Sequence, residues 1–125
     1  MTTWNLEGTK SHLFICNGSS CMRKGGEEVT LAVRHEITRL ELDTQIHTTR
    51  TRCNGRCQDA CIVIAYPEGN WYRVDSQETA RQIVRDLQGD GLEGNKIYQW
   101  MNGAMVPNPA ASPPEGIRKG PVTKG

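Results

Sequence analysis

The chain has 125 residues and a formal net charge of +1 at pH 7, with 23% charged and 36% apolar residues. This length suffices for one ordinary domain, and the near-neutral balance gives no sign of a nucleic-acid or membrane-surface partner. The N-terminus lacks a basic stretch followed by an apolar one, and the longest apolar run, 60–66, is too short to cross a bilayer. We therefore expect a soluble cytoplasmic protein, in a compartment that keeps its five cysteines reduced.

The first predicted elements are a strand, a helix and a second strand. Residues 1–11 form a polar lead-in, and the apolar run 12–16 predicts a short buried strand that ends on a cysteine. From Gly26 onward, apolar residues recur at spacings of four, four and three, which places them on one helical face. These residues are Val29, Val33, Ile37 and Leu40. The β-branched segment 44–51 predicts the second strand.

A hairpin and a second helix follow. Residues 61–66 are apolar on both faces and predict a central strand, 67–70 a tight turn, and 71–74 the returning strand. Asp75 or Ser76 then caps a helix that ends near Gly89. Its buried stripe is formed by Ala80, Ile83, Val84 and Leu87.

The element order β-α-β-β-β-α predicts an α/β fold in which two helices cover a small mixed sheet, similar to thioredoxin. We place this domain at residues 12–89. The remaining residues, 90–125, are rich in Gly, Pro, Asn and Lys and predict an irregular tail, extended or partly disordered. One apolar island in the tail, at 97–101 and 105–106, is expected to pack on something.

Four of the five cysteines form two close pairs. Cys16 and Cys21 flank a turn-forming stretch, and Cys53 and Cys57 flank Asn54-Gly55-Arg56. Iron–sulfur clusters are held by four thiolates that commonly come as close pairs on loops. Because such a cluster carries one electron at a time, the spacing favours electron transfer over bond-making chemistry.

These motifs resemble those of the thioredoxin-like 2Fe-2S ferredoxins. Cys16-x4-Cys21 followed by 22–28 is similar to their first ligand pair and helix entry. Cys53-x3-Cys57, with the Tyr-Pro-Glu-Gly-Asn-Trp-Tyr run at 66–72, is similar to their second ligand loop and hairpin. The first spacing is similar to that of the cluster-bearing peripheral subunit of NADH dehydrogenase, whose helical N-terminal extension is missing here. A free-standing small ferredoxin is therefore the better match.

The resemblance implies one 2Fe-2S cluster whose ligands are Cys16, Cys21, Cys53 and Cys57. It implies a one-electron carrier that delivers electrons to a cytoplasmic redox enzyme. Because the sequence shows no nucleophile–base constellation, phosphate loop or paired-carboxylate cleft, we expect no enzyme activity of its own. Relatives are often dimeric, so a homodimer is left open. Small free-standing relatives also occur beside tetrapyrrole and cobalamin synthesis, which suggests such a pathway.

Cys61 departs from the family pattern, since relatives usually have a small or apolar residue in this strand. We interpret it as a packing residue, because free cysteine is among the most buried residue types. The alternative is a third ligand in the array Cys53-x3-Cys57-x3-Cys61, with a different ligand set or a 4Fe-4S cluster. The histidines, His12, His35 and His47, lack the Cys-x-His pairs of a Rieske site.

Cationic residues lie close to the cysteine pairs in sequence, with only Asp59 of opposite sign. They are Arg23, Lys24, Arg50, Arg52 and Arg56. Neighbouring cations should stabilise a reduced cluster. One hypothesis is that this rim also faces an acidic patch on a redox partner. The other is that the arginines only keep a solvated loop soluble.

Two other functions compete with electron transfer. Four cysteines also suit a structural zinc module, although zinc sites favour Cys-x2-Cys spacing and neither pair has it. The thioredoxin-like order also suggests a thiol–disulfide oxidoreductase, but the Cys-x-x-Cys at the start of the first helix is absent.

Overall fold

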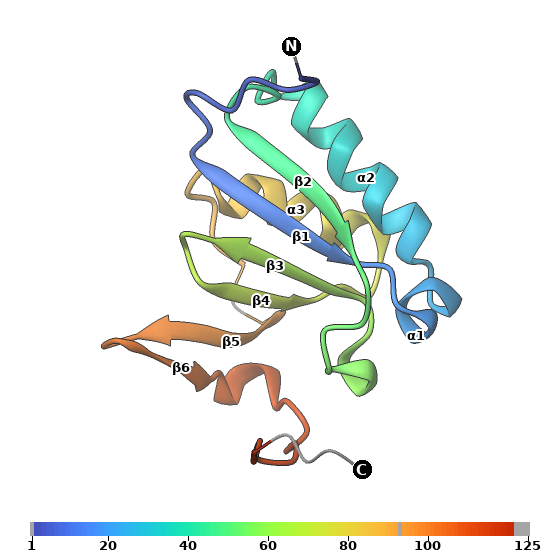
Figure 1. Ribbon diagram of the computed structural model, residues 1–125, viewed down its shortest axis with the longest axis vertical. Helices are drawn as coiled ribbons and strands as arrows, with labels where there is room; N and C mark the ends of the chain where they lie inside the picture. Colours follow the sequence, from blue (N-terminus) through green and yellow to red (C-terminus); the bar gives the residue numbers. More distant parts are fainter. Residues whose placement is uncertain (1, 93, 122–125) are drawn as a thin grey trace.

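A six-stranded mixed sheet forms the centre of the molecule, with helices lying along it (Figure 1). The computed structural model describes residues 2–92 and 94–121. Its strands are β1 (Ser11–Cys16), β2 (Ile46–Thr51), β3 (Ile62–Tyr66), β4 (Asn70–Arg73), β5 (Lys96–Met101) and β6 (Ala104–Pro107). Its helices are α1 (Ser19–Arg23), α2 (Gly26–Arg39) and α3 (Gln77–Asp86), with 3₁₀ turns η1 (Cys57–Asp59) and η2 (Pro109–Ala111). The strands lie in the order β2-β1-β3-β4-β5-β6.

Strand β1 lies inside the sheet, parallel to β2 and antiparallel to β3. Leu13 and Ile15 of β1 are fully buried, whereas His12 and Phe14 point to the other face and are half-buried. Ile15 is opposite Val63 of β3, which is also fully buried. This alternation gives the sheet one strongly apolar face, as the period of a strand requires.

Both long helices of the prediction are present, and they pack against each other. In α2 the predicted stripe is buried at Val29, Val33 and Ile37. In α3 the hydroxyl of Ser76 accepts a hydrogen bond from the Thr79 N–H at 3.1 Å, which identifies Ser76 as the N-cap. The predicted α/β arrangement of two helices beside a small mixed sheet is therefore confirmed, with more strands than the sequence indicated.

A buried carboxylate joins the two helices. Glu36 of α2 is 2% exposed and accepts hydrogen bonds from Arg39 at 2.6 Å and from Arg85 of α3 at 3.0 Å. The hydrogen bond from Arg39 lowers the pKa of Glu36 to about 2, because it outweighs the opposing effect of burial, and Arg85 adds to the lowering. The ionised form of Glu36 thus stabilises the α2–α3 contact.

Part of the segment expected to be an irregular tail is folded. Residues 97–101 of the apolar island lie in β5 and residues 105–106 lie in β6, and the two strands form a hairpin. Strand β5 also pairs with the outer edge of β4. Trp71 lies opposite Tyr98, and the backbone of Gly69 lies so close to Trp100 that a Cβ at Gly69 would be 2.5 Å from the Trp100 Cβ. Strand β5 forms because the free edge of β4 offers it backbone partners far away in sequence. The division of the chain at residue 89 stays a prediction.

The stretch expected to be a plain turn also contains a short helix, α1, which follows β1 directly. Five residues of helix are too few to give a period in the sequence. Within residues 2–92 and 94–121, no helix has the length and apolar character to cross a membrane.

Candidate metal centre

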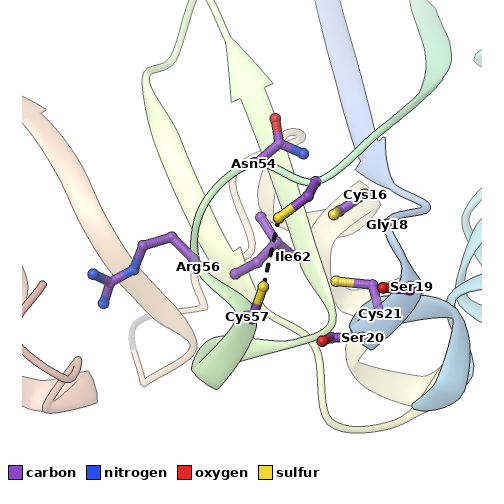
Figure 2. A pocket seen from close by; sticks show the side chains of 10 residues that line it. Cys16, Gly18, Ser19, Ser20, Cys21, Asn54, Arg56, Cys57 and Ile62 are labelled. Carbon is purple, nitrogen blue, oxygen red and sulfur yellow. Dashed lines mark hydrogen bonds between the residues drawn. The ribbon is translucent and has the colours of Figure 1, made fainter. Parts of the chain in front are cut away.

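Two loops meet at the C-terminal end of β1, and each carries one cysteine pair (Figure 2). Strand β1 ends on Cys16, and Cys21 lies within the short helix α1 that follows. The loop after β2 carries Cys53, and η1 begins on Cys57. All four cysteines line one pocket. Figure 2 shows the sulfurs of Cys16, Cys21 and Cys57 directed into a common space.

The pocket has an inner and an outer side. Cys16 and Cys21 are each 3% exposed, whereas Cys53 and Cys57 are exposed, with their sulfurs 3.5 Å apart. The cavity volume is about 30 Å³, which suits a group of a few atoms and excludes an organic cofactor of nucleotide size. Within the described residues, no group of three or more His, Cys, Asp or Glu side chains is arranged to hold a metal ion. The four cysteines are instead spread around the pocket, an arrangement that suits a group of several atoms better than a single ion.

Backbone N–H groups point at the sulfurs. Gly55 donates to the Cys53 sulfur at 3.3 Å. Burial tends to raise the pKa of Cys16, but hydrogen bonds from the Gly18 backbone, Cys21 and Asn54 reverse this, so its pKa is lowered. Burial raises the pKa of Cys21, only partly opposed by a hydrogen bond from the backbone of Ile62. Thiolates that accept hydrogen bonds from backbone N–H groups are the ligands that an iron–sulfur cluster needs. The residues of this pocket therefore fit such a cluster.

Gly18 allows the two loops to approach each other. A Cβ on Gly18 would lie 2.9 Å from the Cα of Cys53 and 3.0 Å from its N and Cβ. The φ of Gly18 is −64°, a value open to any residue, so the restriction comes from the closeness of Cys53. Gly55 differs, since its φ of +84° requires the conformational freedom of glycine at the tip of the second loop.

Two of the arginines near the cysteines are held in ion pairs with carboxylates. Arg50 pairs with Glu27 at 2.8 Å. Arg56 pairs at 2.6 Å with Asp59, and its side chain is directed away from the sulfurs (Figure 2). Arg52 is exposed beside Cys53. The exposed rim of the pocket is therefore less positive than the count of arginines indicated.

Cys61 lies behind the pocket and is 1% exposed. Its thiol is within hydrogen-bonding distance of the Cys21 and Lys24 carbonyl oxygens, at 3.3 Å each. It is not among the described residues that line the pocket. The three histidines lie on β1, α2 and β2, and in the described part of the chain none of them lines the pocket either.

Sequence reasoning missed two contributors, Asn54 and Ile62. The Asn54-Gly55 dipeptide signals a turn but not its contact with the sulfur of Cys16, which lies far away in sequence. Ile62 forms a hydrogen bond to Cys21 through its backbone N–H. Every residue except proline has this group, so the type of side chain cannot indicate the contact.

The chain is similar to known proteins both in sequence and in structure. A protein from Priestia megaterium, provisionally assigned as a 2Fe-2S ferredoxin, is 49% identical over 121 residues, 95% of this chain and 94% of the relative. A 2Fe-2S ferredoxin of Clostridium pasteurianum is 30% identical over 83 residues, 60% of this chain and 81% of the relative. No family model matches the chain.

Among solved structures, the thioredoxin-like 2Fe-2S ferredoxin from Aquifex aeolicus superposes with a TM-score of 0.65 and 25% identity, over 78% of this chain and 99% of that one. A structure of the wild-type Aquifex protein at 1.5 Å gives a TM-score of 0.63 and 27% identity, over 71% of this chain and 97% of that one. The chain belongs to the thioredoxin-like 2Fe-2S ferredoxin family. The predicted resemblance is therefore confirmed.

Proposed function

We propose that this protein is a one-electron carrier that holds a single 2Fe-2S cluster through Cys16, Cys21, Cys53 and Cys57. The observation that carries the proposal is the meeting of these four thiols, from two separate loops, around one small pocket. Such a cluster, when bound, accepts and returns one electron at a time. The family membership supports the same conclusion.

The chain supplies three things at this site. The sulfurs are the ligands, and the backbone N–H groups of Gly18, Gly55 and Ile62 stabilise negative charge on them. Burial of Cys16 and Cys21 keeps water from the inner side. The exposed pair on the outer loop makes that side the route for electrons, because a partner approaches there most closely.

We further propose that the partner presents an acidic patch to the exposed surface around the two cysteine loops. The exposed cations Arg23, Lys24 and Arg52 support this, because opposite charges speed encounter between proteins. The five free cysteines support a reducing, cytoplasmic location. That the electrons serve tetrapyrrole or cobalamin synthesis is suggested by family resemblance alone.

The test is anaerobic purification followed by absorption and EPR spectra and by iron and sulfide analysis. We expect visible absorption bands, an EPR signal on one-electron reduction, and roughly two irons and two sulfides per chain. Serine at any one of the four cysteines should change or abolish these signals. A colourless protein with one zinc per chain would instead identify a structural zinc module. Turnover of a disulfide substrate by metal-free protein would identify a thiol–disulfide oxidoreductase.

A further inference from the structure

A cluster of two arginines around one buried carboxylate lies directly behind the outer cysteine loop. Asp59, the last residue of η1, is 1% exposed, and each of its carboxylate oxygens accepts from a different arginine. Arg56 donates to Oδ2 at 2.9 Å, and Arg73 of β4 donates to Oδ1 at 2.8 Å. The turn that begins on Cys57 is thereby fixed to the sheet through Arg73.

The same two arginines also hold the C-terminal segment that follows β6. Arg56 donates to the carbonyl of Pro114 at 2.8 Å, and Arg73 donates to the carbonyl of Ala111 at 2.9 Å. The guanidinium of Arg56 further lies over the ring of Tyr98 in β5, 5.1 Å from its centroid. Each arginine thus connects Asp59 to the segment 108–116.

This segment packs closely on the loop. A Cβ on Gly116 would lie 3.3 Å from the Nη1 of Arg56. The solved ferredoxin structures from Aquifex aeolicus are covered almost entirely, at 97–99%, yet they account for only 71–78% of this chain. Part of this chain therefore has no counterpart in them.

We propose that Arg56, Asp59 and Arg73 form a clamp that positions the cysteine loop 53–57 by fixing it to the C-terminal segment. Arg56 stands between two of the proposed ligands but turns its side chain away from them, toward Tyr98 and Pro114. It is a positioning residue rather than a ligand. The evidence for the clamp is this set of contacts. Only its effect on a bound cluster depends on the proposed function.

Replacing Arg56 or Arg73 with lysine distinguishes a positioning role from an effect of positive charge alone. The ammonium group of lysine keeps the positive charge of arginine. It cannot replace the planar guanidinium group, which donates to a carboxylate and to a carbonyl oxygen at the same time. We would compare Arg56→Lys and Arg73→Lys with Arg81→Lys, since Arg81 makes a surface pair with Glu78 on α3. All are made in the full chain and loaded anaerobically with iron and sulfide.

The main measurement is amide hydrogen exchange. Both clamp variants should exchange about tenfold to a hundredfold faster at the non-proline residues of 53–59 and 110–116 together, the loss expected for hydrogen bonds to charged groups. Amides of β1 and α2 should keep their protection, and Arg81→Lys should behave as wild type. Transfer of iron to a chelator should be faster in the clamp variants.

Unchanged exchange in Arg56→Lys, or faster exchange in only one of the two segments, would overturn the clamp. If a lysine variant loses protection in β1 as well, it has unfolded globally, and Tyr98→Leu then decides. That change removes the ring beneath the Arg56 guanidinium and keeps an apolar side chain opposite Trp71. It should speed exchange about two- to fivefold in both segments; no change would refute the proposal. Should the protein bind no cluster, the proposed function fails, while exchange in the same variants still decides the clamp.

Discussion

Replacing Gly18 with alanine tests whether the two cysteine loops must lie in direct contact. The added Cβ would be 2.9 Å from the Cα of Cys53, whereas carbon atoms pack comfortably at about 3.5–4.0 Å. The loops must therefore separate by roughly 0.6–1 Å. Crowding of this kind costs about 1–3 kcal/mol. The smaller entropy of the unfolded alanine chain offsets about 0.4–1 kcal/mol of that cost.

A net loss of about 1–2 kcal/mol corresponds to a factor of about 5–30 in an equilibrium between closed and open loops. We expect the Gly18→Ala protein to release iron to a chelator faster by about this factor. The assay follows the decay of visible absorption after chelator is added under anaerobic conditions. Gly94→Ala is the matched control, because Gly94 has no heavy atom within 4 Å of its added Cβ.

Equal decay rates in Gly18→Ala and Gly94→Ala would contradict this prediction. That result would mean that the loops part at no cost, so their contact does not hold the four sulfurs together. Faster decay in Gly18→Ala alone would support it. Far-UV circular dichroism of both variants checks that the fold is retained, so that the comparison concerns the loops.

Three further predictions concern other parts of the molecule. The lowered pKa of Glu36 means that the unfolded chain binds its proton more readily, so its stabilising effect is present above about pH 4.5 and is lost as the pH falls toward 2. Glu36→Gln should remove this part of the pH dependence of the urea midpoint, and an unchanged profile would contradict it. Cys61→Ala should leave the visible spectrum as in wild type while lowering stability by about 1–3 kcal/mol; an altered spectrum would make Cys61 a ligand. Arg52→Glu should slow reoxidation by the anion ferricyanide roughly fivefold at low salt, and salt-independent rates would exclude steering.

Local signals in the sequence were enough for the elements that surround the site. Periodic apolar residues indicated α2, the cap at Ser76 indicated α3, and apolar runs indicated β1 and β3. Each of these signals depends on residues a few positions apart. They could therefore be recognised without knowledge of the tertiary contacts.

Signals were missing where an element depends on a distant partner. Strand β5 exists because β4 leaves an edge to pair with, and the composition around it indicated disorder instead. The role of Arg56 was likewise hidden, since its contacts with Tyr98 and Pro114 span more than forty residues. In the sequence, an arginine near the cysteines suggests an electrostatic effect on the cluster. Its structural role is visible only from the residues that it contacts in the folded chain.

Residue type and spacing were enough to indicate the chemistry of the site: two cysteine pairs on turn-forming loops, in a chain with the helix and strand periods of a small α/β domain. They did not indicate which pair is buried, which backbone N–H groups face the sulfurs, or which contacts hold the outer loop. Local conformation and potential ligands follow from neighbouring residues in the sequence. Burial and hydrogen-bond partners depend on segments that meet only when the sheet has formed.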